Sequence, residues 1–413
     1  MSASNEIPID RQASVFLNHL VLALFDRAAK PPSERSDRLG ALFVLDDAND
    51  IERVFNDPIT FEKDFSLVSA VGPSRFNMNG MDWINIRAKT QRQYAKAGKP
   101  SAVHVYQDIY QEELLRLTNC RPHQLGDALS RAALRCFFSA LGIEVDPSIL
   151  LRHFLELRRM VELLQYRSWV PAADGSPELE EIEIELSSIL SRLWQSCQES
   201  QPLMDMFNRF SVQGDPFPLK TVFTDFLTNM FAGVETTTAT LLWMVDCLSR
   251  GSDVQQALRE DVHAKIDQRL DGFRDETLRL FSPIPFVVRK LTAPSSFRGI
   301  KLGAGELIMV SLVGLHRDPM YWTTPLSFRA ARPEFSDQAK LSKRSFRPFL
   351  SGPRSCGGRR IAEMELNVGL RIILKHFLLR NEGPDSAFRY SIAFRPTFSD
   401  DLVIERIEAK ADA

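Results

Sequence analysis

The chain has 413 residues, and its composition is that of an ordinary globular protein, with 44% hydrophobic and 25% charged residues. Its formal net charge is −2, so it lacks the strong basic excess of many nucleic-acid-binding proteins. This length allows one large domain or two to three small ones. The sequence contains no internal repeat and no long linker, and we therefore expect one domain over residues 1–413.

The most apolar run near the N-terminus, Val15–Phe25, is too short and too polar to anchor the chain in a membrane. Asn18 and His19 interrupt it and Asp26 follows it, whereas a membrane span needs about 20 mostly apolar residues. Neither a basic segment nor a small-residue cleavage site precedes the run, so a secretory signal is not expected. We interpret residues 1–30 as a lead-in without a membrane anchor, and we expect the protein in the cytoplasm.

Most of the chain has the apolar periodicity of helices. Apolar residues three and four apart predict helices over 104–120, 126–142, 147–168 and 177–199. The segment 219–250 is apolar on nearly all sides, which predicts a long central helix that is buried on most of its surface. Two shorter helices are expected within 252–282, and a final helix is expected over 359–380.

Strands are expected in the second half of the chain. Phe286–Leu291 and Leu307–Leu312 contain the β-branched and apolar residues that are typical of strands. Residues 317–358 are rich in Pro, Gly, Arg and Ser and have little periodicity, and a loop of this length in a compact domain is usually functional. The sequence therefore predicts a mostly α fold with a minor β part.

The cysteines are widely spaced, and none of them has a partner at the spacing of a zinc site. Four lie in segments that look helical, where a cysteine usually acts as a small buried hydrophobic residue: Cys120, Cys136, Cys197 and Cys247. Cys356 differs because it lies in a glycine-rich loop just before the last predicted helix.

Several features of the Cys356 loop would favour a thiolate. Positive charge and a helix N-terminus both promote thiolate formation, and the dipole of the helix that begins near Gly358 points at this sulfur. Gly357 and Gly358 leave backbone N–H groups free to approach the sulfur, and a glycine-rich turn lets the chain pass close to a flat ligand. The alternative is a surface turn in which the cysteine is incidental.

The residues around Cys356 resemble a family signature. The pattern is similar at every fixed position to the cysteine-ligand signature of the cytochrome P450 monooxygenases, in the order Phe349, Gly352, Arg354, Cys356, Gly358 and Ala362. The resemblance implies the triangular cytochrome P450 fold, with a long central helix and a Cys-ligand loop, as a single haem–thiolate monooxygenase domain. It also implies that Cys356 is the axial ligand of the iron of haem b. Phe349, Arg354 and Gly358 would bind the cofactor, Arg354 through a propionate.

A second motif is Glu276-Thr-Leu-Arg279, in which the two charged side chains share one face of a helix. An isolated pair of this kind is most often a solvated surface bridge. In the family that the chain resembles, the pair is joined by a later arginine and locks the core on the cysteine side of the haem. That arginine is expected to be Arg332, which would place a buried carboxylate between two guanidinium groups.

A third motif, Ala232-Gly-Val-Glu-Thr-Thr237, lies in the middle of the predicted central helix. Gly233 costs about 1 kcal/mol in a helix relative to alanine, and consecutive threonines are stiff at χ1. A sequence that breaks a local rule in this way marks a functional site or, alternatively, a kink for packing. The segment resembles the oxygen-activation motif of the P450 family, which implies catalytic roles for Gly233, Glu235 and Thr236.

Further cofactor contacts are expected from Trp83, Arg87 and Arg289. Trp83 and Arg87 are four residues apart and share a helix face, which alone usually means packing beside a solvated charge. The resemblance implies that Trp83 and Arg87 hold a haem propionate, although many soluble members have His in place of Trp83. Arg289 matches the strand arginine of the family that also reaches a propionate.

The residues expected to line the substrate pocket are apolar, so a lipophilic substrate is predicted, such as a terpenoid, a steroid or a fatty acid. Simple core packing is the alternative for each of them. Trp83 and the residues around Cys356 resemble members that oxidise terpenoids. The expected lining residues are Phe65, Val68, Phe76, Phe231, Val234, Phe286, Val287 and Phe394.

The resemblance implies a monooxygenase that takes O2 as co-substrate and accepts two electrons. No glycine-rich loop for a flavin or NAD(P) is found, so we expect a separate ferredoxin- or flavodoxin-like donor. Cations such as Lys89, Arg92 and Lys96 are expected to form a basic face on the cysteine side that attracts this donor. A solvated face is the alternative. A peroxide-driven haem enzyme and a non-catalytic homologue that activates a partner remain alternative functions, and a monomer is expected.

Overall fold

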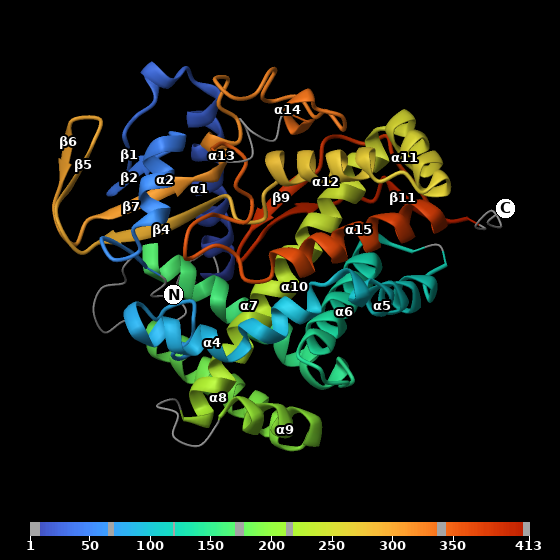
Figure 1. Ribbon diagram of the computed structural model, residues 1–413, viewed down its shortest axis with the longest axis horizontal. Helices are drawn as coiled ribbons and strands as arrows, with labels where there is room; N and C mark the ends of the chain where they lie inside the picture. Colours follow the sequence, from blue (N-terminus) through green and yellow to red (C-terminus); the bar gives the residue numbers. More distant parts are fainter. Residues whose placement is uncertain are drawn as a thin grey trace, which may run out of the picture.

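The computed structural model describes residues 9–64, 70–118, 120–169, 177–211, 218–336 and 344–407. Helices dominate these residues (Figure 1). In the first half they are α1 (Ile9–Ala29), α2 (Ala48–Asn56), α4 (Gly80–Ala97), α5 (Val103–Leu115), α6 (Pro122–Ala140), α7 (Ser148–Trp169), α8 (Pro177–Gln198) and α9 (Gln201–Phe210). In the second half they are α10 (Leu219–Arg250), α11 (Ser252–Ala264), α12 (Gln268–Leu280), α13 (Leu312–Leu315), α14 (Pro333–Ser336) and α15 (Arg359–His376).

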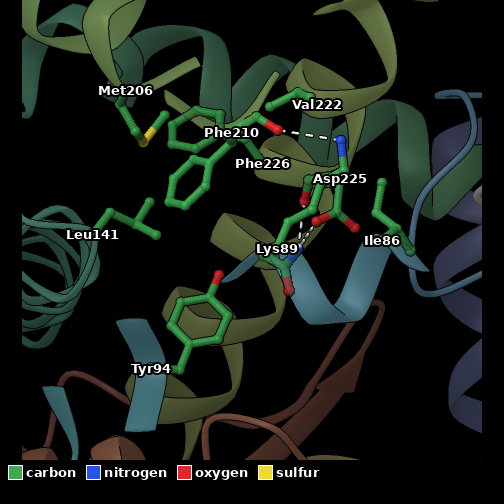
Figure 2. Close-up of a pocket in the computed structure, with 10 residues that line it drawn as sticks. Ile86, Lys89, Tyr94, Leu141, Met206, Phe210, Val222, Asp225 and Phe226 are labelled. Atoms are coloured by element: carbon green, nitrogen blue, oxygen red, sulfur yellow. Dashed lines mark hydrogen bonds between the residues drawn. The ribbon is translucent and has the colours of Figure 1, made fainter. Parts of the chain in front are cut away.

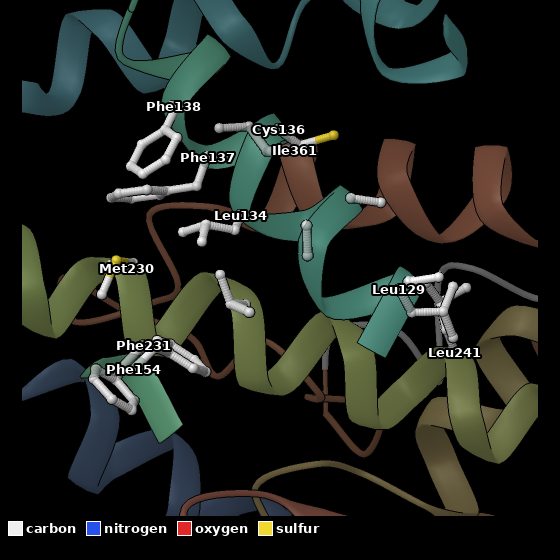
Figure 3. Close-up of a cluster of buried hydrophobic side chains, with 14 of the residues drawn as sticks. Leu129, Leu134, Cys136, Phe137, Phe138, Phe154, Met230, Phe231, Leu241 and Ile361 are labelled. Carbon is white, nitrogen blue, oxygen red and sulfur yellow. The ribbon is translucent and has the colours of Figure 1, made fainter. Parts of the chain in front are cut away.

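Helix α10 is the axis of the helical part. It has 32 residues and crosses the molecule next to α6 and α15 (Figure 1). Most of its side chains are buried, because apolar residues occur on all of its faces and neighbouring helices cover them. Figure 3 shows one of these contacts, in which Phe154 of α7 stacks on Phe231 of α10 with 4.4 Å between ring centroids.

A five-stranded sheet lies at the other side of the molecule (Figure 1). Its strand order is β1 (Arg38–Leu39), β2 (Leu42–Leu45), β7 (Leu307–Ser311), β4 (Phe286–Leu291) and β3 (Phe61–Lys63). β2 and β7 are parallel, and the other neighbours are antiparallel. Since β3 and β4 pair with Lys63 opposite Arg289, this edge of the sheet brings two cations together.

Three two-stranded sheets complete the β part. β5 (Ser295–Phe297) pairs with β6 (Ile300–Leu302), β8 (Phe377–Asn381) with β11 (Leu402–Arg406), and β9 (Ala387–Tyr390) with β10 (Phe394–Thr397). The hairpin β9–β10 packs against α1 and α10. It therefore joins the N-terminal helix to the central one.

The N-terminal apolar run is part of α1. Leu17, Val21 and Leu24 are buried against the sheet and the β9–β10 hairpin. Among the residues that the structure describes, no helix is long and apolar enough to cross a membrane.

Candidate active site

The loop before α15 has a backbone that only certain residues can adopt. Gly352 has φ +69°, and a Cβ atom there would lie 2.2 Å from the carbonyl oxygen of Phe55, so glycine is required. Leu350 also has a positive φ, of 60°. The Cys356 N–H donates a hydrogen bond of 2.9 Å to the Phe349 carbonyl oxygen, which closes the loop. The cysteine is thus held directly before the helix N-terminus at Gly358.

The thiol of Cys356 is exposed to solvent and is influenced by the protein around it. Its side chain is accessible to solvent, yet burial by surrounding protein is the largest influence on its pKa and raises it. The Gly358 N–H, which hydrogen-bonds the sulfur, and the nearby Lys63 and Arg359 lower this pKa. An accessible sulfur with a backbone donor and cations around it is suited to act as a metal ligand in the thiolate form.

Two arginines connect the cysteine loop with α4. Arg354 donates to the Met78 carbonyl oxygen and to Asn79 Oδ1, both at 2.7 Å, and its guanidinium lies 4.0 Å from the centroid of the Trp83 ring. Arg87 lies over the same ring at 5.2 Å, so Trp83 contacts both guanidinium groups. Within the described part of the chain, the buried Nε of Arg354 has no hydrogen-bond partner.

More cations gather at the edge of the sheet nearest to this loop. Arg289 on β4 is buried, and burial together with Arg354 lowers its pKa to about 10. Burial lowers the pKa of Lys63 on β3 well below its usual value, and repulsion from Arg289, Arg354 and Arg75 lowers it further. These cations repel one another, so an anionic ligand placed among them would be strongly stabilised.

The central helix carries the expected catalytic motif beside an accessible surface. Gly233 is exposed and Thr236 is half-buried, although the neighbouring Phe231 and Val234 are buried. The Thr236 hydroxyl donates a hydrogen bond of 2.6 Å to the Ala232 carbonyl oxygen. Glu235 is buried, and its carboxylate accepts a hydrogen bond of 2.6 Å from Arg395 Nη2 on β10. Neither the carboxylate nor the hydroxyl is therefore free of protein partners.

The structure brings Glu276, Arg279 and Arg332 together in one buried cluster. Arg279 Nε and Arg332 Nε each lie 2.7 Å from an oxygen of Glu276, and all three side chains are 0% exposed. Arg279 also donates to the carbonyl oxygens of His316 and Pro325. The cluster ties α12 to the long loop that precedes the cysteine, so it is a structural support rather than a surface bridge.

The expected pocket residues do not all lie in one place. Phe65 and Val68 fall outside the described residues. Phe286 and Phe394 belong to the hydrophobic core between α1, α10 and the sheet, where Phe394 stacks on Trp243 at 5.0 Å. Core neighbours cover these two side chains, and their assignment to the pocket stays a prediction.

The remaining pocket candidates differ in exposure. Phe231 and Val234 are buried on α10. Phe76 and Val287 are half-buried, and the Nζ atom of Lys63 lies 4.4 Å from the centroid of the Phe76 ring. Phe76 thus lies near the cationic edge of the sheet, and Val287 lies in the sheet strand that carries Arg289.

The cations of the basic face expected on α4 differ in exposure. Arg92 and Lys96 are exposed, and Gly98 at the end of α4 contacts Arg360 at the start of α15. Lys89 is only half-buried and donates a hydrogen bond of 3.1 Å to the Phe210 carbonyl oxygen. Figure 2 shows Lys89 lining a pocket between α4, α9 and α10, and its place on the basic face stays a prediction.

Three site residues escaped the sequence analysis. Lys63, Arg75 and Arg395 contribute charges to the site, but they belong to no motif and lie far in sequence from their partners. Arg75 pairs with Asp225 of α10 at 3.5 Å, and Arg395 pairs with Glu235. No sequence pattern around these three residues indicates a role in the site.

The residues present fit a haem. Segments far apart in the chain contribute the parts that a haem needs. These parts are an accessible cysteine sulfur, a set of mutually repelling cations for two propionates, and an accessible glycine on the central helix. The buried Arg354 Nε is a donor for which an anionic ligand would be the acceptor. Cys356 would bind the iron, and Arg87, Arg289 and Arg354 would bind the propionates.

Comparison with known proteins gives the same result over part of the chain. The family model described as cytochrome P450 matches residues 194–391. Cytochrome P450 4X1 of Mus musculus is 34% identical over 166 residues, which is 36% of this chain and 32% of that protein. Cytochrome P450 2J3 of Rattus norvegicus is 32% identical over 184 residues, 40% of this chain and 36% of that protein. The chain thus spans about a third of the length of the curated relatives it matches.

Solved structures are similar over nearly the whole chain. A six-coordinated cytochrome P450 from Thermus thermophilus has a TM-score of 0.70 at 21% identity, and the match covers 94% of this chain and 98% of that one. The haem domain of cytochrome P450DA has a TM-score of 0.74 at 19% identity, with 94% and 92% covered. These structures confirm the mostly α fold with a minor β part. The family model and the sequence matches place the matched part of the chain, residues 194–391, in the cytochrome P450 family.

Proposed function

We propose that the protein is a haem–thiolate monooxygenase that inserts one atom of O2 into a lipophilic small molecule. The observation that carries this proposal is the accessible Cys356 sulfur, which lies in a closed loop with Lys63 and Arg359 nearby. When bound, haem supplies the activation of dioxygen, and the protein supplies binding, orientation and electrostatics.

The residues around the cofactor have separate tasks in this proposal. Cys356 would hold the haem iron through its sulfur, and the Gly358 N–H would stabilise the charge on that sulfur. Phe349 holds the backbone of Cys356 through its carbonyl oxygen, and Trp83 orients Arg87 and Arg354. The Glu276 cluster would keep the long loop in place beneath the cofactor.

Proton delivery would use Glu235 and Thr236. Both lie in the stretch of α10 where Gly233 leaves accessible surface, and general acid catalysis requires a proton donor within reach of the reacting atoms. Glu235 would bring protons from outside the site, and Thr236 would donate a hydrogen bond inside it. This pair favours a monooxygenase over a peroxide-driven enzyme, which needs no such delivery.

The proposed substrate class rests on the apolar residues expected in the pocket. Phe76, Phe231, Val234 and Val287 offer no charged group, so a terpenoid, a steroid or a fatty acid is the expected substrate. We also propose that the protein is a single domain, that it is a monomer and that it is located in the cytoplasm.

Electrons would come from a separate ferredoxin- or flavodoxin-like protein. Arg92 and Lys96 on α4 and Arg360 on α15 are exposed near the junction of α4 and α15, the helix that follows the cysteine loop. Exposed cations in such a cluster would steer an acidic donor towards this side of the molecule.

The function is tested by comparing two ways of driving turnover. Lipophilic probes (a monoterpene alcohol, a steroid and dodecanoic acid) are first screened for a shift of the Soret band. Each probe that binds is then supplied with NADPH, a ferredoxin and its reductase, or with hydrogen peroxide alone. Oxygenated product that depends on NADPH and O2 is expected. Product formed only with peroxide would show a peroxide-driven enzyme instead.

A further inference from the structure

The hairpin β9–β10 carries two arginines that form ion pairs with acidic residues on two different helices. Arg395 on β10 lies directly opposite Arg389 on β9. Arg395 Nη2 donates to Glu235 of α10 at 2.6 Å, and Arg389 Nη2 donates to both oxygens of Glu162 of α7, at 2.8 and 2.7 Å. The hairpin is therefore tied to α10 and to α7 by separate ion pairs.

The carboxylate of Glu235 lies between two guanidinium groups. Its second oxygen, Oε1, is 3.6 Å from Arg158 Nη1 on α7, and the Glu235 side chain is only 5% exposed. Arg158 lies one helical turn before Glu162, so the two ion pairs form one network across α7, α10 and the hairpin. Opposite charges at these distances attract one another and fix the position of the carboxylate.

Arg395 is the stronger partner in this network. Its bond to Glu235 is a direct, charge-assisted hydrogen bond, whereas the contact with Arg158 is longer than a hydrogen bond. The Arg395 side chain is 20% exposed, which leaves its ion pair poorly screened by water. Removal of Arg395 would therefore leave Glu235 with one distant cation and no fixed orientation.

This arrangement bears on proton transfer because Glu235 and Thr236 are neighbours on α10. The Thr236 hydroxyl donates to the Ala232 carbonyl oxygen, and the Glu235 carboxylate is bound to Arg395. A proton that passes through Glu235 must reach a carboxylate whose place is set by the hairpin. The hairpin thus controls a group that lies on another element, 160 residues away in the chain.

We propose that Arg395 is a positioning residue for Glu235, so that the hairpin β9–β10 sets the orientation of the acid that delivers protons to the site. This role rests on the proposed monooxygenase function. It assigns no contact between Arg395 and the substrate or the cofactor, since Arg395 acts through Glu235 alone.

The test measures how the holoenzyme divides reduced oxygen between peroxide and water. Forming H2O2 takes two electrons and two protons for each O2, and forming two water molecules takes four of each. Slower proton delivery therefore shifts the products towards peroxide. The assay uses NADPH, a ferredoxin and its reductase without any substrate, and it records the peroxide released for each NADPH oxidised.

The variants are Arg395→Gln, Arg395→Lys, Glu235→Gln and the double variant Arg395→Gln/Glu235→Gln. We expect Arg395→Gln to raise the peroxide fraction about twofold or more, and Arg395→Lys to restore part of the loss, because a lysine keeps the charge without the fixed geometry. In the Glu235→Gln background, Arg395→Gln should add nothing, because residues that act as a unit are not additive.

Arg389→Gln is the matched control. It removes the cross-strand neighbour and its ion pair with Glu162 but leaves Glu235 untouched. Thermal unfolding of the protein should show whether both single variants keep the fold, and Arg389→Gln should release peroxide like the wild type. Two results would show that Arg395 has only a structural role. One is an equal rise of the peroxide fraction in Arg389→Gln and Arg395→Gln, and the other is a further rise caused by Arg395→Gln in the Glu235→Gln background. A wild-type holoenzyme that oxidises no NADPH would instead contradict the proposed function itself.

Discussion

At the residue scale, removing the Thr236 hydroxyl should change the structure very little and the coupling of electrons to product strongly. Among the residues that the structure describes, this hydroxyl donates only to the Ala232 carbonyl oxygen within its own helix. Alanine is a better helix former than threonine, so Thr236→Ala should leave the fold, the haem content and substrate binding nearly intact. Reducing equivalents should then leak to peroxide or water instead of product.

Thr240→Ala provides the control for this variant. Thr240 lies one turn further along α10 and makes the same kind of bond, at 2.8 Å to the Thr236 carbonyl oxygen. Product formed for each NADPH should fall in Thr236→Ala and stay unchanged in Thr240→Ala. Equal coupling in Thr236→Ala and the wild type would remove Thr236 from the mechanism.

A second residue-scale prediction concerns Glu365 on α15. Burial raises its pKa from the usual 4.5 to about 8, although a hydrogen bond of 3.0 Å from the Tyr110 hydroxyl lowers it slightly. The folded protein therefore keeps this carboxyl group protonated where the unfolded chain releases the proton. Its contribution to stability is complete below pH 4.5 and is lost progressively as the pH rises to about 8.

Replacing Glu365 with Gln should flatten this part of the pH dependence. Denaturant unfolding measured between pH 5 and pH 8 should give a smaller decline in the free energy of unfolding for Glu365→Gln than for the wild type, by about 1 kcal/mol or more. Glu363→Gln, on the same helix but paired with Arg359 near the surface, should keep the wild-type decline. A Glu365→Gln profile parallel to the wild type would mean that the carboxyl group is ionised in the folded state.

At the element scale, the Glu276 cluster holds α12 against the loop that leads to Cys356. Glu276→Ala would leave Arg279 and Arg332 buried without their carboxylate, which should cost about 3–5 kcal/mol of stability. Haem incorporation should fall with it, because the long loop loses its attachment. Glu112→Ala is the control, since Glu112 is half-exposed and its pairs with Arg116 and Arg135 should contribute little.

A Glu276→Ala protein with wild-type unfolding and full haem content would contradict this account. In that case the ion pairs of this cluster would contribute no more to stability than a solvated surface bridge does. Denaturant unfolding and the ratio of Soret to protein absorbance measure the two effects independently.

The elements that the sequence predicts best are those with a strong local pattern. The central helix, expected over 219–250, is observed as Leu219–Arg250, because its apolar residues continue until Gly251. The strand Phe286–Leu291 also agrees with its expectation. The strands β8 to β11 and the helices α1 and α9 were not predicted, because they are short or follow no clear period and are stabilised by distant partners.

The site residues, too, are predictable where the pattern is local and not where it depends on distant partners. The cysteine loop and the threonine motif are contiguous, so their residues could be named from the sequence. The partners of Glu235 could not, because Arg158 and Arg395 lie 77 or more residues away and only the fold brings them to α10. Helical spacing and family order also do not reveal which neighbours cover a side chain, such as those around Lys89 and Phe394.

At the scale of the whole molecule, the exposed cations predict a salt-sensitive encounter with the electron donor. Arg92 and Lys96 are exposed, and salt screens the attraction between exposed charges. Electron transfer from an acidic ferredoxin should therefore slow as ionic strength rises. Arg92→Glu and Lys96→Glu should slow it at low salt without altering the Soret shift caused by a bound probe.

Lys301→Glu is the control for charge reversal, because Lys301 is exposed on β6 at the far end of the molecule (Figure 1). It should leave the rate of electron transfer unchanged. Rates that respond neither to salt nor to reversal at Arg92 and Lys96 would show that the donor docks on another face.

The central claim is that Cys356 binds the haem iron as a thiolate. The reduced protein with carbon monoxide should show the long-wavelength Soret band that is diagnostic of thiolate ligation. Cys356→Ala should abolish this band, and Cys120→Ala, at a half-buried cysteine of the chain, should keep it. A Cys356→Ala protein that retains the band, while another cysteine variant loses it, would contradict the assignment.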